Sequence, residues 1–242
     1  MADHCVAVEV LEGPVSAAFD VAETLANAVS LRPEPASKLA RGLVLGAAAR
    51  IRPVHAAPVS LADTTDPREA AQRIVRACLA QAQANEAGVL ESADIEFVHQ
   101  HRVALRRLRS ALRLFRGALE PGEDAAFAAD LRWAAAALGR CRDWDVFVTE
   151  TLPPLAAAEG DPEHGREILR RARAHQREAR RAARAAILSP RYGLTMIRLL
   201  RWVSAPAEPR AGQPDLKSYA SERLRKGARR VAVQSAAFGT LD

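Results

Sequence analysis

The sequence contains few aromatic residues and few cysteines, and both shortages narrow the classes of protein to which it can belong. Phe, Trp and Tyr make up 5% of the 242 residues, so side chains on which single-stranded nucleic acid could stack its bases are scarce. The three cysteines, Cys5, Cys78 and Cys141, form no C-x-x-C pair. Zinc binding and dithiol redox chemistry therefore have no support, and reduced thiols are typical of a cytoplasmic protein.

Several longer features are missing as well. No run of about 18 apolar residues occurs, so we expect no membrane span. The N-terminus carries Asp3 and Glu9 instead of a basic region followed by an apolar one, which argues against a signal peptide. The sequence has no P-loop, nucleophile elbow, G-x-G-x-x-G or H-E-x-x-H motif. We therefore predict a cytoplasmic protein with no catalytic residues, no metal and no cofactor.

What the sequence does contain favours helices and a basic surface. Hydrophobic residues make up 49% of the chain, which is enough for a core. Alanine, leucine and arginine are abundant, and all three are strong helix formers. The formal net charge is +6, and a basic surface attracts phosphate-bearing polymers or acidic membranes.

Residues 1–57 differ from the rest of the chain and predict a short, partial α/β segment. Cys5–Leu11 and Ser37–Leu45 have the composition of strands, and Ser16–Val29 has apolar residues at helical spacing. Residues 58–66 are the predicted linker to the helical domain.

From Pro67 onward the pattern is helical and predicts an all-α helical bundle. Asp66 can cap a helix that begins at Pro67, Ser92 can cap the next one, and Gly139 can end the third. The stretch 192–203 is too apolar to stand exposed, so it should pack on the first bundle or on a second copy of the chain. The predicted helices are residues 67–86, 92–119, 124–138, 142–152, 162–188, 192–203 and 216–233.

The second of these helices carries two stripes at steps of three and four residues. The first stripe is apolar and predicts a core face: Leu105, Leu108, Leu112, Phe115 and Leu119. The second stripe begins at His99 and is basic: Arg102, Arg106, Arg109, Arg113 and Arg116. At 100° per residue the stripes lie about 60° apart on the helix, so the arginines should flank the core along a groove.

The long helix repeats this arrangement, and a third basic cluster, 223–230, lies near the C-terminus. The row on the long helix is Arg166, Arg170, Arg173, Arg177, Arg180 and Arg184. Rows of like charge repel, and arginine offers a fork of donors that matches phosphate oxygens. Three such rows indicate an external polyanion, although a solvated face partly neutralised by acidic residues explains a basic row as well.

A second motif, LGRCRDWDV at residues 138–146, contains the carboxylates Asp143 and Asp145. If Gly139 ends a helix, these carboxylates lie in the first turn of the next one, where the helix dipole favours them. Alternatively, they pair with stripe arginines and hold the groove in shape. A paired-carboxylate metal or acid–base site is a weaker alternative.

The segment HQHRVALRRLR (99–109), followed by Phe115 and LGRCRDWDV, resembles the CHAD family, the conserved-histidine α-helical domain. The resemblance implies two pseudo-symmetric four-helix bundles and a basic groove that binds inorganic polyphosphate. The signature histidine of the family would be His99. Its signature arginines would be Arg102, Arg106, Arg107 and Arg109, and its RD-x-D segment would be Arg142, Asp143 and Asp145. His101 stands where the family often has an apolar residue.

The N-terminal segment resembles the tail of a CYTH domain, the triphosphate-tunnel fold that often precedes CHAD. The segments VEVLEG and FDVAETLANAVSLRPEPASKLARG carry this resemblance. The E-x-E-x-K strand of that family is absent, so a closed tunnel is not expected. We expect a CYTH-like remnant at 1–57 and a CHAD-like domain at 67–242 whose second bundle is truncated, as in a fragment across the junction of two domains.

These observations lead to a prediction of non-catalytic polyphosphate binding, with polyphosphate granules and a homo-oligomer as possible partners. The predicted binding residues are His99, Arg102, Arg106, Arg107, Arg109, Arg113, Arg173, Arg177 and Arg180. Arg142, Asp143 and Asp145 are the predicted structural ion pairs. The alternatives are a degenerate CYTH-type phosphohydrolase, a nonspecific nucleic-acid-binding protein and a purely structural interaction protein.

Overall fold

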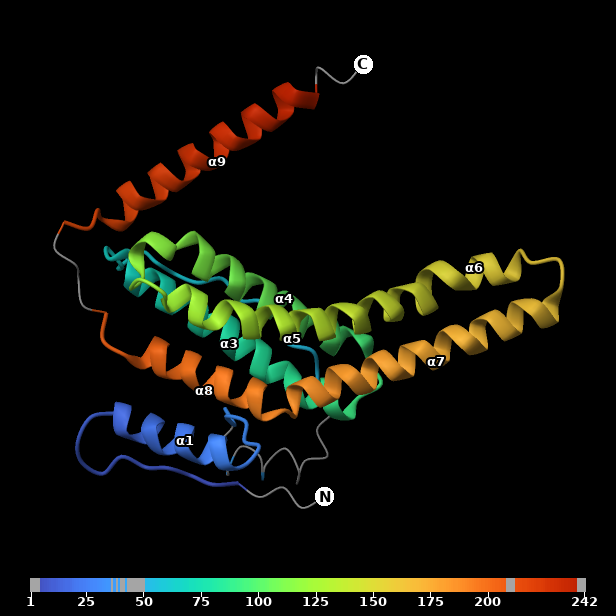
Figure 1. Cartoon of the computed structure of the whole chain (residues 1–242), viewed down its shortest axis with the longest axis horizontal. Coiled ribbons are helices and arrows are strands. Elements are labelled where there is room, and N and C mark those ends of the chain that lie inside the picture. Colours follow the sequence, from blue (N-terminus) through green and yellow to red (C-terminus); the bar gives the residue numbers. More distant parts are fainter. Residues whose placement is uncertain are drawn as a thin grey trace.

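The computed structural model describes residues 5–35, 37, 39, 42, 51–207 and 212–238, and every regular element in those residues is helical (Figure 1). The all-α class predicted from the sequence is confirmed. In chain order the helices are α1 (Ser16–Ala28), α3 (Pro67–Glu91), α4 (Ile95–Leu114), α5 (Glu123–Val146), α6 (Leu152–Ala157), α7 (Pro162–Ile187), α8 (Pro190–Ser204) and α9 (Leu216–Phe238).

Helices α3, α7 and α8 each begin at a proline that follows a side-chain cap. Asp66 accepts a hydrogen bond from the Glu69 amide at 2.8 Å, and Asp161 and Ser189 do the same for α7 and α8. Proline suits the first helical position because its missing N–H would have no partner there. These starts are therefore fixed locally, as the sequence indicated for α3 and α7.

The start and end of α4 differ from the prediction. Asp94, not Ser92, caps the helix by accepting from the Glu96 amide at 2.9 Å, while the Ser92 hydroxyl accepts from the Asp94 amide. At the other end α4 stops at Leu114, and a single 3₁₀ turn, Arg116–Ala118, follows it.

The prediction that Gly139 ends a helix is wrong, because α5 continues through it to Val146. A helical glycine costs only about 1 kcal/mol relative to alanine. Leu131, Leu138 and Cys141 are buried along α5, and packing on this scale outweighs that cost. A π-helical turn, Phe147–Thr151, then leads into α6, so Pro153 and Pro154 lie in its first turn instead of ending the preceding helix.

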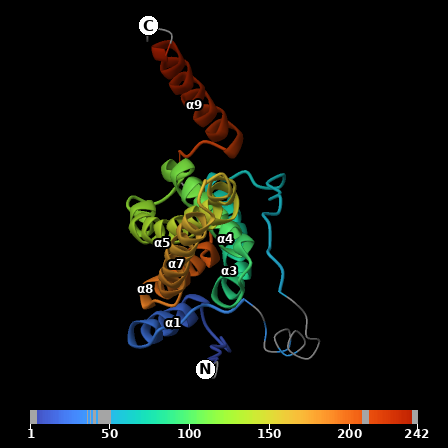
Figure 2. The ribbon, with the colours of Figure 1, turned by 90° about the vertical axis from the view of Figure 1, so that its right-hand side faces the viewer.

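The core lies where α3, α4, α5 and α8 meet. The predicted apolar stripe of α4 is confirmed as its buried face, since its members are at most 5% exposed. Viewed along the long axis, these helices form one bundle with α1 on one side (Figure 2). The far part of α5, with α6 and α7, projects from the bundle as a hairpin (Figure 1).

The two C-terminal helices differ in how they are covered. Helix α8 packs on the bundle through Tyr192, Met196 and Leu199, each at most 1% exposed. Helix α8 therefore packs on the bundle of its own chain, which is one of the two alternatives predicted for residues 192–203. Helix α9 touches the bundle at Tyr219, whose ring stacks on Phe115 with centroids 5.7 Å apart, and then leads away from it (Figure 2).

The strand predicted at Cys5–Leu11 is wrong, because these residues have no regular secondary structure, are exposed and have no ladder partner among the described residues. An unpaired strand has no ladder hydrogen bonds to stabilise it. The candidate at Ser37–Leu45 lies mostly outside the described residues, and Leu39 and Gly42 within it are helical. Helix α1 packs on α8 instead, where Arg201 pairs with Asp20 at 2.6 Å.

The chain after α1 also runs close against the bundle. The Ser30 hydroxyl donates to the Leu188 carbonyl at 2.6 Å. A Cβ at Gly193 would lie 1.7 Å from the Leu31 carbonyl oxygen, so only glycine allows this approach.

We therefore expect Gly193→Ala to force the segment around Leu31 off α8. The clash involves backbone, so the variant should lose about 1–3 kcal/mol of stability in urea unfolding and should be cleaved faster by protease before Pro67. Gly227→Ala on α9 is the matched control, since its Cβ would meet nothing within 4 Å. Equal urea midpoints for the two variants would contradict the close approach.

Candidate functional site

A hollow of about 510 Å³ lies along the seam between α4 and α5. Leu112 and Leu131 form its floor, and both side chains are at most 4% exposed. Its rim is basic, because helical spacing brings the α4 stripe to the edge of the buried face. The lining residues are Arg106, Arg109, Ser110, Leu112, Arg113, Arg116, Ala128, Leu131 and Arg132.

Three of the rim arginines lack a counter-charge among the described residues. Arg106, Arg109 and Arg113 are exposed, and the described part of the chain places no carboxylate beside them. Some arginines elsewhere are paired, as in Arg68, which donates to both carboxylate oxygens of Glu123 at 2.8 and 2.9 Å. Like charges one turn apart repel by a few tenths of a kcal/mol per pair. The hollow is thus a local surplus of positive charge with free donors.

Three predicted binding residues on α4 lie outside the lining of this hollow, and His99 is one of them. Arg107 points toward α3 and donates to the Gln81 side chain at 2.9 Å. Arg102 is half-buried beside α5, where a Cβ on Gly139 would come within 3.9 Å of its Nε atom. Neither residue is part of the lining of the hollow.

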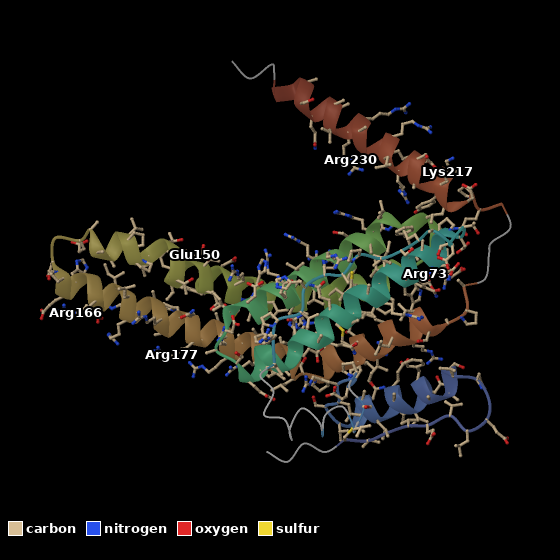
Figure 3. The ribbon with its side chains drawn as sticks, turned by 180° about the vertical axis from the view of Figure 1, so that it is seen from behind. Arg73, Glu150, Arg166, Arg177, Lys217 and Arg230 are labelled. Atoms are coloured by element: carbon tan, nitrogen blue, oxygen red, sulfur yellow. The ribbon has the colours of Figure 1, made fainter. Side chains whose placement is uncertain are left out.

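The arginines of α7 line a second, separate hollow of about 360 Å³. Its lining residues are Arg166, Leu169, Arg170, Arg173 and Arg177. Figure 3 shows Arg166 and Arg177 on the projecting hairpin, away from the bundle. The predicted arginines of the α4 and α7 rows therefore line two hollows with no residue in common.

Arg180 and Arg184, at the inner end of the α7 row, close the C-terminal end of α3. Arg180 donates to the Ala93 carbonyl at 2.8 Å, and Arg184 donates to the Val89 carbonyl at 3.1 Å. Val89 is in the last turn of α3, where carbonyls have no partner within the helix, so Arg184 satisfies one of them, while Ala93 lies in the connection that follows α3. Arg180, predicted to bind the ligand, is thus engaged in holding α3 and α7 together.

The carboxylates of LGRCRDWDV lie in the last turns of α5, so their predicted position in a first turn is wrong. Asp145 is fully buried: it accepts from Gln176 at 2.8 Å and lies 3.7 Å from the Arg180 guanidinium. Asp143 is exposed. Arg142 lies 4.0 Å from Glu150. The structure thus places Asp145, and not Asp143, in a buried ion pair.

The two histidines of the HQH segment have different surroundings. His99 is half-buried, and its Nδ1 atom has no hydrogen-bond partner. His101 is fully buried, and its Nε2 atom lies 3.0 Å from the Tyr192 hydroxyl. Sequence reasoning found no role for His101.

The same hydroxyl belongs to a network that sequence reasoning missed. Tyr192 donates to Glu86 at 2.6 Å, and Arg32 donates to the other carboxylate oxygen of Glu86 at 3.0 Å. The chain Arg32–Glu86–Tyr192–His101 therefore ties the N-terminal segment to α3, α8 and α4. One signal was available, since Glu86 follows Leu79 by seven residues on the buried face of α3.

Burial controls the charges in this network. It raises the pKa of the Glu86 carboxyl from 4.5 to about 7, against the opposing effect of the Tyr192 and Arg32 hydrogen bonds. It also lowers the pKa of His101 to about 3, so this imidazole is neutral at physiological pH. Desolvation disfavours the charged form in both cases.

The protein is thus a helical bundle with three unpaired arginines along the seam between α4 and α5. The chain matches the CHAD domain model over residues 73–242, and it belongs to the CHAD domain family. The crystal structure of the CHAD domain from the plant Ricinus communis is similar, with a TM-score of 0.66 and 30% sequence identity.

The similarity to the plant structure covers 79% of this chain and 63% of that chain. This chain therefore spans less than two thirds of the plant domain. A comparison with curated proteins finds no match. The family match begins at Arg73, and no comparison supports a CYTH-like tail at residues 1–57. Within the described residues, no helix is both long and apolar enough to cross a bilayer.

The pKa of Glu86 gives a prediction for stability. Between pH 4.5 and about 7 the folded chain keeps a proton on Glu86 that the unfolded chain releases. The contribution of Glu86 to stability should therefore fall as the pH rises through this window and stay low above it. The free energy of unfolding of the wild type, minus that of Glu86→Gln, should fall by about 3 kcal/mol across the window.

The measurement is urea unfolding in half-unit pH steps, with Glu163→Gln as the control. Glu163 is an exposed carboxylate near the start of α7. The difference in unfolding free energy between the wild type and Glu163→Gln should not change across this pH window. If the difference between the wild type and Glu86→Gln did not change either, this account of the network would be contradicted.

Proposed function

We propose that the protein binds inorganic polyphosphate in the hollow between α4 and α5 and does not hydrolyse it. The observation that carries this proposal is the row of unpaired, exposed arginines at the rim, Arg106, Arg109 and Arg113. A bound polyanion would relieve their repulsion and accept hydrogen bonds from their guanidinium forks. Membership of the CHAD family supports it, since that family is associated with polyphosphate binding.

The chemistry of the lining favours polyphosphate over single-stranded nucleic acid. Proteins that bind single strands without sequence preference stack the bases on aromatic side chains. The lining of the α4–α5 hollow has arginines, a serine and aliphatic residues but no aromatic ring. The lining can therefore form contacts with phosphate groups alone. In a polymer without bases, every unit supplies such a group.

The first experiment measures the affinity of the triple variant Arg106→Gln, Arg109→Gln and Arg113→Gln for long-chain polyphosphate. We expect at least a tenfold weaker affinity, which is about 1.4 kcal/mol. The slope of log affinity against log salt should also fall by about 2, because fewer counterions are released. Since glutamine is a good helix former, the helix should persist.

The matched control removes three positive charges elsewhere, at Arg52, Arg73 and Lys217. All three side chains lie outside the two hollows, and Arg73 is at the opposite end of the molecule from the hairpin (Figure 3). If the control lost as much affinity as the rim variant while both stayed folded, net charge would explain the binding and the hollow would not.

The absence of catalysis is a separate prediction. Within the described residues, no group of three or more His, Cys, Asp or Glu side chains is placed to hold a metal ion. We expect no phosphate release from tripolyphosphate in magnesium or manganese above the buffer rate. The alternative is a CYTH-type phosphohydrolase that uses Glu9, and turnover that Glu9→Ala abolishes would support that alternative instead.

A further inference from the structure

The second hollow, on α7, is an anion-binding surface of the same chemical kind as the first. Arg173 and Arg177 are exposed and have no carboxylate partner in the described part of the chain. Arg166 and Arg170 extend the row and are held at its outer end by Glu163 at 3.9 Å and Glu167 at 2.6 Å. Exposed pairs of this kind are weak and leave donors available.

Two arginines near the inner end of the hairpin are already engaged. Arg180 lies against the buried Asp145 and donates to the Ser92 and Ala93 carbonyls. Arg142 lies beside Glu150. Arginines without a carboxylate partner therefore line two separate hollows, one on the bundle and one on the hairpin.

The hairpin is built as a stiff arm. Val148, Leu152 and Ala172 form a small core of their own between its two sides. Trp144 stacks on His175 with ring centroids 5.0 Å apart. At 1.5 Å per residue, Arg166 lies about 21 Å along α7 from Arg180. The arm therefore holds its arginines well outside the bundle (Figures 1 and 3).

We infer that the α7 arm is a second polyphosphate-binding site and that the two sites let one molecule cross-link long polyphosphate chains. This inference rests on the proposed function of the α4–α5 hollow. Because one site is on the bundle and the other is on the hairpin, the two sites can bind two polyphosphate chains, or distant parts of one chain, at once. A long chain in turn binds many copies of the protein, so the mixture forms a network.

The stoichiometry of a short anion tests the two sites directly. Calorimetric titration with tripolyphosphate, which is too short to span both hollows, should give two ions bound per wild-type chain. The arm variant Arg166→Gln, Arg173→Gln and Arg177→Gln should bind one. The rim variant Arg106→Gln, Arg109→Gln and Arg113→Gln should also bind one.

Light scattering with long-chain polyphosphate tests the cross-linking. Wild-type scattering should pass through a maximum as polyphosphate is added, because an excess of either partner leaves chains unlinked. The scattering intensity of the arm variant at that maximum should be lower by on the order of tenfold. Its affinity for long chains should change by less than about threefold. The control triple at Arg52, Arg73 and Lys217 should scatter as the wild type does.

Each failure has a distinct meaning. If the wild type does not bind polyphosphate at all, the proposed function is wrong. If it binds one tripolyphosphate, and the arm variant scatters like the wild type, the second site is wrong and the first stands. If either triple variant abolishes all binding, the arginines form one continuous surface and cross-linking by two sites is overturned.

Discussion

The place of the arginines depends on the burial of the opposite face of α4. Leu105, Leu108 and Leu112 are each at most 4% exposed, and together they fix the rotation of the helix about its axis. Turning the helix about its axis would expose these leucines at about 2 kcal/mol each. The repulsion within the arginine row is only a few tenths of a kcal/mol per pair, too little to offset the burial of the leucines. Burial of the leucines therefore determines the orientation of α4, and the arginines remain along the seam.

Arginine has two distinct roles in this molecule, and its partners distinguish them. Arg68 and Glu123 join α3 to α5 through two hydrogen bonds, while Arg180 and Arg184 close the end of α3. These guanidinium groups are held by fixed acceptors and stabilise the fold. Arg106, Arg109 and Arg113 at the rim, and Arg173 and Arg177 on the arm, have no such acceptors among the described residues, so their donors remain available to a ligand. Counting arginines in the sequence cannot separate the two sets.

Much of the fold could be predicted from the sequence because its signals are local. The buried stripe of α4 and the proline starts of α3 and α7 depend on residues within one or two turns. The failures depend on contacts between distant residues. Gly139 lies inside a helix because α5 packs along its length, and Asp145 is buried by Gln176 and Arg180, which lie more than 30 positions later. The separation of the α4 and α7 rows into two hollows could not be predicted, because periodicity does not give the relative direction of two helices.

The contact between the N-terminal segment and the bundle belongs to the same class of long-range feature. Arg32 and Glu86 are 54 positions apart, and Glu86 and Tyr192 are 106 apart. This network holds α4 through His101, which lies between His99 and Arg102. The segment expected to be a remnant of another domain is thus held against α3 and α8, and it is linked through Tyr192 and His101 to the helix that carries the rim.

The central claim is that the unpaired arginines select a phosphate polymer without bases. A competition assay tests it most directly, with labelled long-chain polyphosphate displaced by unlabelled polyphosphate, single-stranded DNA or RNA at equal phosphate concentration and equal salt. The account predicts that unlabelled polyphosphate competes at least about tenfold better than either nucleic acid, because the lining offers no ring on which a base can stack. Equal competition by all three polymers would contradict it and would make the protein a general polyanion binder.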